Sequence, residues 1–342
     1  MGRNQTILPR KPEDLLFPLL LYFCQWKEKF SNSIKTNKRI DVMENKIKVA
    51  IIGLDTSHAV EFPKLMQDPA VPEQNQVHDL VATRCLRFET PFQNKEGLDK
   101  RQAYLESIGV MVTEDFDTAV ADCDAIMIEI NDPAKHLEYF EKCAGLGKPI
   151  FLDKPFADTL DNAVRIMQIA KENNVRFFTS SSLRYDVDFV DGLAKGVKPE
   201  SAVVWGPVGR APAGSSIVWY GVHAFEMLQR IMGCGAVSVN VSGDRKGYVC
   251  HVVYGDGRRG IVELTYGSYR YGGVIRDDRE KEVLFQVSYR VPFYQMLIIE
   301  IIKFFKGESQ VIPLEDSFEV MAMLSAADRS AATGRPEPVY VK

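Results

Sequence analysis

The sequence lacks the features that mark several classes of protein. No apolar run approaches the roughly 18 residues of a membrane-spanning helix, and the mean hydropathy is −0.14. Basic and acidic residues nearly balance, 42 against 46, so no basic surface for nucleic acid is indicated. The cysteines stand singly at 24, 85, 123, 143, 234 and 250, without CxxC spacing. This pattern argues against a disulfide framework or a zinc cluster and favours a reduced, cytoplasmic interior.

Histidine is also scarce, and its spacing points to no metal. The histidines at 58, 78, 136, 223 and 251 show neither i, i+4 nor HxH spacing, so no metal site is predicted. What is present is an ordinary globular composition, with 46% apolar and 26% charged residues. A length of 342 residues is enough for two domains, each with a full hydrophobic core.

The first 45 residues differ from the rest. Residues 15–26, LLFPLLLYFCQW, form an apolar run too short to span a bilayer, and no small-residue cleavage site follows Trp26. We interpret residues 1–45 as an N-terminal extension, which can be disordered. A membrane-surface anchor or an atypical signal is the alternative.

Short apolar strands alternate with helices between residues 46 and 180. Strands are predicted at 46–52, 78–84, 110–112, 125–130, 149–152 and 175–179. Asp132-Pro133 and Thr159 are typical of helix starts in the intervening segments. The alternation predicts an α/β fold, a doubly wound parallel (Rossmann) sheet with helices on both faces.

The rhythm changes in residues 181–342. Strands are predicted at 237–241, 248–254, 260–266 and 283–289, with the hairpin signal Asp256-Gly257 between the second and third. Helices are predicted at 222–232, 293–305 and 314–330. This half reads as an α+β domain with a large, mostly antiparallel sheet, whose C-terminal helix can pack back on the first domain.

The first strand turns into a helix at residues 53–58, GLDTSH. A dinucleotide-binding loop would read GxGxxG, and only Gly53 is present. Asp55 stands where the backbone approaches the phosphates, and His58 stands where glycine allows close helix packing. The hydroxyls of Thr56 and Ser57 can replace lost amide contacts. Alternatively, Asp55 and Ser57 only cap the helix.

The second strand is predicted to end at a basic residue rather than an acidic one. Arg84 at this position suits a ribose 2′-phosphate, and hence NADP rather than NAD. A solvent-facing arginine at a strand end is the alternative.

Residues 124–155, DAIMIEINDPAKHLEYFEKCAGLGKPIFLDKP, form the most specific segment. They resemble the glucose–fructose oxidoreductase / inositol dehydrogenase (Gfo/Idh/MocA) family, whose pattern is a strand, a TPxxxH-like loop, a helix, AxxxGK and EKP. The matching positions are Asn131, Asp132, Pro133, His136, Ala144, Gly147, Lys148, Asp153, Lys154 and Pro155.

The resemblance continues to the end of the chain. Arg184-Tyr185 is similar to the family's R-Y/F pair, Gly221-Val222-His223 to its GxH motif, and residues 316–338 to its closing helix and tail. Trp219 departs from the family, which has aspartate at this place in DxGxH. An indole cannot relay a proton, but it can stack on a sugar face.

The resemblance implies roles for these residues. Lys154 would be the catalytic lysine and His223 the proton acceptor, roles that an ammonium and an imidazole can fill. The implied cofactor site comprises Gly53, Asp55, Thr56, Ser57, His58, Arg84, Asn131, Pro133, His136, Asp153, Lys154 and Pro155. The implied substrate contacts are Lys154, Arg184, Trp219, His223 and Arg270. An exposed strand and turn is the alternative reading for Arg270 and its tyrosine neighbours.

These observations predict an NAD- or NADP-dependent oxidoreductase that transfers a hydride between the cofactor and a hydroxyl of a sugar, cyclitol or related polyol. A catalytically silent relative that binds a sugar-like ligand or a partner is one alternative. The other is a non-redox enzyme that uses Asp55, His58 and His223. The expected partners are a small-molecule substrate and further copies of the chain, as a dimer or tetramer, with no nucleic acid and no membrane.

Overall fold

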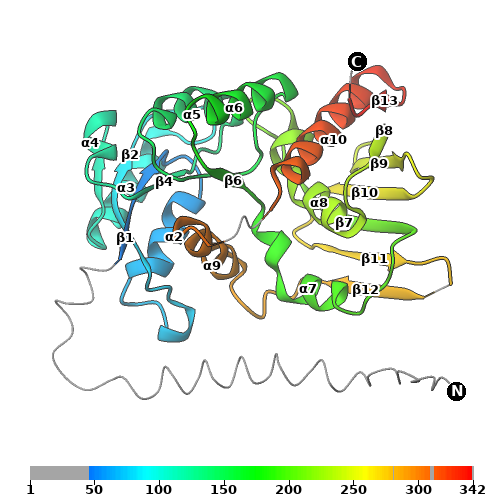
Figure 1. Cartoon of the computed structure of the whole chain (residues 1–342), viewed down its shortest axis with the longest axis horizontal. Helices are drawn as coiled ribbons and strands as arrows, with labels where there is room; N and C mark the ends of the chain where they lie inside the picture. The colour runs from blue at the N-terminus through cyan, green and yellow to red at the C-terminus, as the bar shows by residue number, and fades with distance from the viewer. Residues whose placement is uncertain (1–45, 280, 309–311, 341–342) are drawn as a thin grey trace, which may run out of the picture. The chain divides into compact units, whose positions relative to one another are not determined.

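The computed structural model describes residues 46–279, 281–308 and 312–340, and these contain two sheets (Figure 1). The predicted N-terminal extension, with Cys24, lies outside the described residues. Within them, no helix combines the length and the apolar character needed to cross a membrane.

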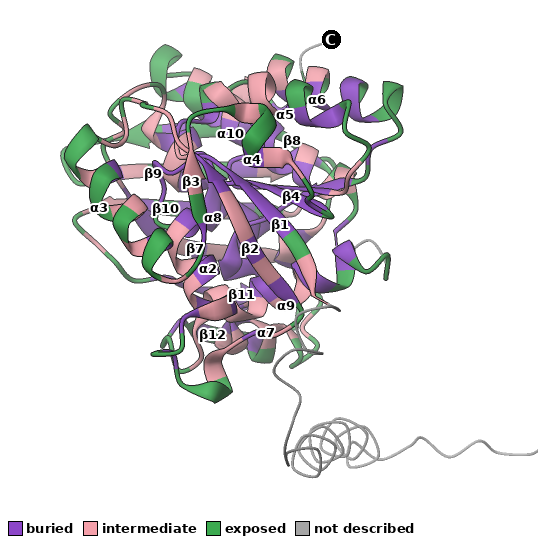
Figure 2. Cartoon of the chain, turned by 90° about the vertical axis from the view of Figure 1, so that its left-hand side faces the viewer, coloured by how far each residue is buried: buried purple, intermediate pink, exposed green. Residues whose placement is uncertain are grey.

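The first sheet is entirely parallel and has the order β3-β2-β1-β4-β5-β6. Its strands are β1 (Ile47–Ile52), β2 (Leu80–Leu86), β3 (Met111–Thr113), β4 (Ala125–Ile128), β5 (Ile150–Leu152) and β6 (Phe177–Thr179). Its helices are α2 (His58–Gln67), α3 (Lys95–Ser107), α4 (Phe116–Val120), α5 (His136–Ala144) and α6 (Leu160–Glu172). The central strands are apolar because helices cover both of their faces (Figure 2). The predicted Rossmann topology is confirmed, and the strand order reverses between β1 and β4.

The second sheet has the order β12-β11-β7-β10-β9-β8-β13. Its strands are β7 (Ser201–Val208), β8 (Ala236–Gly243), β9 (Gly247–Tyr254), β10 (Arg259–Tyr266), β11 (Gly272–Arg276), β12 (Glu282–Gln286) and β13 (Glu337–Pro338). All pairs are antiparallel except β7 with β10, so the prediction of a mostly antiparallel sheet is confirmed. Gly257 makes the β9–β10 turn at φ +92°, as the Asp256-Gly257 signal predicted.

Four helices belong to the second half: α7 (Val187–Leu193), α8 (Ser216–Met232), α9 (Phe293–Phe305) and α10 (Leu314–Thr333). Three short 3-10 turns, η1 (Glu73–Asn75), η2 (Pro133–Lys135) and η3 (Ser182–Tyr185), complete the elements. Ser215 caps α8 by accepting from Val218 N, so this helix begins six residues before the predicted start at 222. The longer helix carries Trp219 and His223 on adjacent turns.

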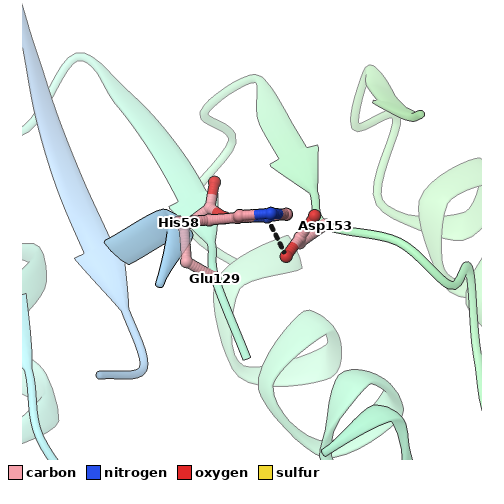
Figure 3. Close-up of side chains that lie close together, drawn as sticks. All are labelled: His58, Glu129 and Asp153. Carbon is pink, nitrogen blue, oxygen red and sulfur yellow. Dashed lines mark hydrogen bonds and ion pairs between the residues drawn. The ribbon is translucent and has the colours of Figure 1, made fainter. Parts of the chain in front are cut away.

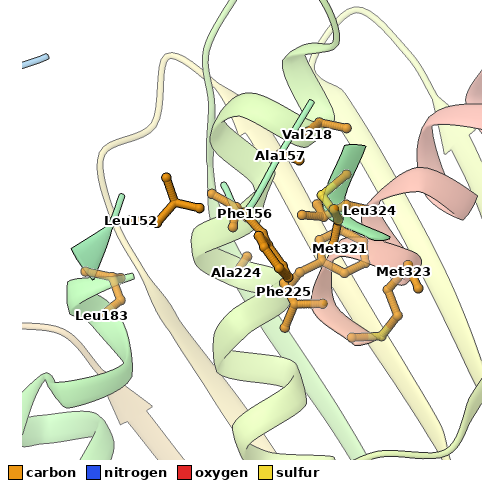
Figure 4. Packing of buried hydrophobic residues seen from close by; sticks show 14 of the residues in the cluster. Leu152, Phe156, Ala157, Leu183, Val218, Ala224, Phe225, Met321, Met323 and Leu324 are labelled. Atoms are coloured by element: carbon orange, nitrogen blue, oxygen red, sulfur yellow. The ribbon is translucent and has the colours of Figure 1, made fainter. Parts of the chain in front are cut away.

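One apolar core joins the two sheets. Leu152, the last residue of β5, and Phe156, which follows this strand, pack in the same cluster as Phe225 of α8 and Met321 of α10 (Figure 4). In the other half of the core, α9 packs against α2 and buries its apolar face with the first sheet. The halves are therefore fixed against each other by continuous hydrophobic packing, which holds the carboxyl ends of the first sheet close to α8.

Gly53 follows β1 and lies against Glu129, the residue that follows β4. Its φ is +106°, and a Cβ added there would lie 2.4 Å from the carbonyl oxygen of Glu129.

We therefore expect Gly53→Ala to lower the free energy of unfolding by about 3 kcal/mol or more, because backbone strain and overpacking add. Urea denaturation measures this loss. Gly109→Ala is the matched control, since φ is +90° but a Cβ there would meet nothing within 4 Å. It should lose only about 1–2 kcal/mol, and equal losses would show that the clash with β4 costs nothing.

Candidate functional site

A cavity of about 320 Å³ opens at the carboxyl ends of the parallel strands, opposite α8 and α9. The first sheet contributes the turn into α2, the loop after β4 and the residue after β5. Seven predicted site residues line it together: Thr56, Ser57, His58, Asn131, Lys154, Trp219 and His223. They come from segments up to 167 positions apart, between Thr56 and His223, so tertiary structure brings them to one place.

Sequence reasoning missed Arg101 and most of an aromatic wall. Arg101 of α3 lines the cavity and donates to the carbonyl oxygen of Leu54 at 2.8 Å. The aromatic wall consists of Tyr220, Tyr269, Tyr271, Tyr289, Phe293 and Tyr294, of which all but Tyr269 and Tyr271 were not predicted. The run YGSYRYGG signalled two of them, but nothing in the sequence indicated that α9 would reach the same cavity. None of the described lining residues is a carboxylate.

Asp55 is turned away from the cavity. It is buried, and its carboxylate accepts hydrogen bonds from Asn131 N at 2.7 Å, Asp132 N at 3.2 Å and the hydroxyl of Thr90 at 2.7 Å. Burial raises the pKa of Asp55 above its ordinary value, against the opposite effect of these hydrogen bonds. The side chain therefore connects the loops that follow β1 and β4. This differs from both predicted roles of Asp55, a position beside the cofactor phosphates and a cap of the helix.

Arg84 lies within β2 and not at its end, because the strand continues to Leu86. Its guanidinium donates to the carbonyl oxygen of Ala121 and pairs with Asp122 at 3.6 Å. The basic residue that follows the strand is Arg87, which is bound to Gln102 and Asp99 of α3. Arg87, and not Arg84, therefore stands at the end of β2, where a residue that contacts the ribose was predicted. The reason is that the strand is two residues longer than its apolar pattern indicated.

His136 supports the site from behind. It is completely buried, and its Nε2 lies 2.8 Å from the carbonyl oxygen of Ile130 and its Nδ1 3.4 Å from that of Phe156. Pro133 and Pro155 flank these contacts without lining the cavity. His136 therefore holds the loop after β4 against the loop after β5.

Arg184 and Arg270 also lie outside the cavity lining. Arg184 is buried and donates to the carbonyl oxygen of Glu226 at 3.1 Å and to the Asp316 carboxylate at 3.3 Å. Arg270 is exposed on the turn before β11. The predicted substrate contact of Arg184 is replaced by a structural link from η3 to α8 and α10.

His223 enters the cavity from α8. Its Nδ1 lies 2.7 Å from the hydroxyl of Ser181, and the ring packs edge-on against Tyr220 and Tyr271. Burial, followed by the positive charges of Lys154 and His58, lowers the pKa of His223 well below its ordinary value. The imidazole is therefore neutral at neutral pH and available to accept a proton.

Trp219 joins the two halves of the site. Its indole Nε1 donates to the side-chain oxygen of Asn131 at 2.9 Å, and its ring packs against Phe92 and Tyr220. Trp219 thus forms an apolar wall with its one polar atom already bound, as its chemistry predicted.

His58, which lines the cavity, forms a buried cluster with Glu129 and Asp153 (Figure 3). His58 Nδ1 lies 2.7 Å from Asp153 Oδ2 and 3.9 Å from Glu129 Oε2. Donor atoms of all three side chains lie within 4.8 Å of one another, close enough to consider a cation. However, two ligands bound at a right angle about 2.1 Å from one ion would be about 3 Å apart. The shorter distance between His58 and Asp153 is that of a direct hydrogen bond.

The part of the cavity nearest α2 fits an anionic group such as a pyrophosphate. Hydroxyls of Thr56 and Ser57 and the guanidinium of Arg101 line it beside the first turn of α2. A helix N-terminus and a cation both favour negative charge, and Asp55 directs its own charge elsewhere. This donor set differs from a glycine-rich loop but fits the same chemistry.

Comparisons with known proteins agree with this fold. Residues 47–181 match the model of an oxidoreductase family with an NAD-binding Rossmann fold, Gfo/Idh/MocA. An uncharacterized oxidoreductase of Schizosaccharomyces pombe is 26% identical over 146 residues, which are 42% of this chain and only 36% of that relative.

Solved structures match over most of the chain. GenD2 from gentamicin A biosynthesis, in complex with NAD, has a TM-score of 0.72 at 15% identity, covering 87% of this chain and 97% of its own. Myo-inositol dehydrogenase from Lactobacillus casei, in complex with NAD(H) and myo-inositol, has a TM-score of 0.70 at 16% identity, covering 87% and 98%. At these identities the likeness shows a shared two-part fold.

The buried carboxyl group of Glu226 makes the stability of the fold depend on pH. Burial raises the pKa of Glu226 to about 7 from an ordinary value of 4.5, although Arg184 and the hydrogen bond from Ser181 N oppose the shift. The neutral carboxyl therefore stabilises the fold fully below pH 4.5, and this contribution is lost as the pH rises through 7.

We expect the wild type to lose about 3 kcal/mol relative to Glu226→Gln between these two pH values. Urea denaturation of both proteins across the pH range measures the difference. Glu141→Gln, at an exposed position on α5, is the control and should parallel the wild type. Parallel profiles for Glu226→Gln as well would mean that Glu226 titrates normally.

Proposed function

We propose that this chain, whose residues 47–181 match the Gfo/Idh/MocA oxidoreductase family, is an NAD(P)-dependent dehydrogenase that acts on a CH–OH group of a sugar, cyclitol or related polyol. The observation that carries the proposal is that Lys154, from the first half, and His223, from the second, line one cavity. A hydroxyl bound between an ammonium and a neutral imidazole has the two groups that its oxidation needs.

The residues divide the reaction between binding and proton transfer. When bound, a nicotinamide cofactor would accept a hydride from the carbinol carbon. Lys154 donates a hydrogen bond to the hydroxyl oxygen and stabilises the charge that develops there. His223, kept neutral by its burial, accepts the hydroxyl proton. The hydroxyl of Ser181 is bonded to Nδ1 of His223 and fixes the orientation of the ring. Nε2 is therefore the nitrogen that remains to accept the proton.

The cofactor phosphates would be held by the turn into α2. Thr56 and Ser57 supply hydroxyl donors, Arg101 supplies a positive charge, and the helix N-terminus supplies its dipole. Asn131 continues the same surface after β4, where the strand order reverses and ligands bind in folds of this type.

The aromatic wall supports a polyol or sugar as substrate. The indole face of Trp219 suits the C–H face of a sugar ring, and the hydroxyls of Tyr220, Tyr271 and Tyr289 can bond its hydroxyl groups. The absence of carboxylates from the described lining means that a negatively charged group would also be accepted.

We propose, in addition, a cytoplasmic homo-oligomer, a dimer or tetramer. The described cysteines, at 85, 123, 143, 234 and 250, are free thiols, which suits a reducing compartment. Exposed apolar side chains of the second sheet, Val237, Val249 and Leu284, offer a surface for a second copy.

Cofactor binding is the first test. Calorimetric titration of the full chain with NADH and NADPH separately should give micromolar binding of at least one. Arg101→Ala should weaken that binding by about tenfold, because a charged contact to phosphate is lost. Arg165→Ala, at a partly exposed surface position, is the control. No wild-type binding of either cofactor at millimolar concentration would refute the dehydrogenase proposal.

Lys154→Ala tests the catalytic assignment. We expect kcat for NAD(P)-linked polyol oxidation, followed at 340 nm, to fall by at least about a hundredfold while the melting temperature and cofactor affinity stay unchanged. Lys171→Ala, on the exposed end of α6, should retain full activity. An unchanged kcat in Lys154→Ala would remove this lysine from the mechanism.

A further inference from the structure

His58 stands where this fold usually has a glycine, and its side chain is held in one orientation by a carboxylate. The Asp153 carboxylate follows β5 and has both oxygens bound, Oδ2 to His58 Nδ1 at 2.7 Å and Oδ1 to Lys154 N at 2.8 Å. Burial opposes ionisation of Asp153, but the positive charges of His58 and Lys154 and these hydrogen bonds outweigh it and lower its pKa. A firmly ionised Asp153 fixes the His58 tautomer with its proton on Nδ1.

The other ring nitrogen of His58 is left for the cavity. His58 lines the same cavity as Lys154 and His223, and within the described part of the chain Nε2 makes no hydrogen bond. Phe62 stacks on the ring at 5.3 Å and Tyr294 packs edge-on at 4.9 Å, so its plane is fixed. An imidazole with Nδ1–H on a carboxylate and a free Nε2 lone pair has the arrangement of a general base.

Of the two carboxyl groups that face His58, only Asp153 is held in its ionised form. Asp153 and Glu129 face it from the ends of β5 and β4, Lys154 and His223 from across the cavity, and Tyr294 from α9. Glu129 is fully buried without a hydrogen-bond partner among the described residues, and burial followed by the charge of Asp153 raises its pKa well above its ordinary value. A neutral Glu129 leaves Asp153 as the counter-ion of the His58 ring.

His223 differs in this respect. Its Nδ1 faces a neutral hydroxyl, and no carboxylate forms an ion pair with it among the described residues. A proton that His223 accepts would sit in a buried position beside Lys154 with no direct counter-charge. Such a proton is more stable on an imidazole that has a direct counter-charge, as the His58 ring has in Asp153.

We propose that His58, oriented by Asp153, is a second catalytic acid–base residue of this cavity and the final acceptor of the proton that the substrate hydroxyl loses. The inference rests on the proposed dehydrogenase function. A bound NAD(P)⁺ would take the hydride from the carbinol carbon, and as the C=O bond forms the O–H proton ends on His58 Nε2, directly or through His223. In the reverse reaction the same nitrogen returns the proton.

Chemical rescue tests this role. His58→Ala should reduce kcat by about a hundredfold or more, which is the usual contribution of an acid–base group. Added imidazole should restore activity in proportion to its concentration, because it can occupy the space vacated beside Asp153. His78→Ala is the matched control: His78 is partly exposed, pairs with Glu73 at 3.1 Å, and should show neither loss nor rescue.

Asp153→Asn separates orientation from folding. The amide cannot act as counter-ion, so we expect kcat to fall while cofactor affinity and melting temperature stay close to those of the wild type, with no rescue by imidazole. If His58→Ala does not fold, His58→Gln with the same calorimetric and kinetic readouts replaces it. Retained kcat in a folded His58 variant would overturn the proposal.

A third measurement is independent of any substrate. Diethyl pyrocarbonate should modify His58 in the full chain, as mapped by mass spectrometry, because the free Nε2 reaches the cavity. Modification of His78 and His223 without His58 would overturn the proposal, since Nε2 would then be closed off. A wild type that reduces no cofactor would refute the dehydrogenase function, whereas an active wild type with an active His58→Ala would refute this inference alone.

Discussion

Parallel pairing of β1 with β4, and of β4 with β5, is the constraint on which the site depends. Parallel strands end at the same edge of a sheet, so the loops after these three strands must meet. Asp55 can therefore bind the amides of Asn131 and Asp132, and His58 can bind Asp153, although 95 positions separate the last two. An antiparallel neighbour would have carried one of these groups to the opposite edge.

Burial of charge is the second determinant. Asp55 and Asp153 are stable in the interior because amide, hydroxyl or imidazole donors bind their oxygens. Glu129 and Glu226 have weaker compensation, and their pKa values rise. The result is a site in which negative charge lies behind the cavity wall, while the lining itself carries Arg101, Lys154 and two histidines. Such a field favours anionic groups, and it fits both a phosphate and an alkoxide that develops during oxidation.

Three residues that depart from the family pattern acquire a structural explanation. With the second and third glycines absent, His58 lines the cavity and Asp55 is turned away from it, and each makes a hydrogen bond to another loop. Trp219 replaces an aspartate and binds Asn131, which connects α8 to the loop after β4. The acid–base capacity missing at position 219 is matched by the His58–Asp153 pair on the opposite wall, as we propose.

The sequence by itself determined the alternation of strands and helices, and with it the doubly wound sheet, because hydrophobic periodicity and capping residues such as Thr159 act locally. Short motifs also predicted Lys154 and His223 as site residues, and both line the cavity. Only the tertiary structure decided that Arg84 binds Ala121, that Arg184 binds Glu226 and Asp316, and that α9 brings Tyr294 to the cavity. The strands β7 and β11 were not predicted, because strand formation there depends on side-chain packing against neighbouring strands, which the local sequence does not show. Partners far apart in the chain leave no local signal, because the free energy that selects them arises from packing and charge compensation in the folded state.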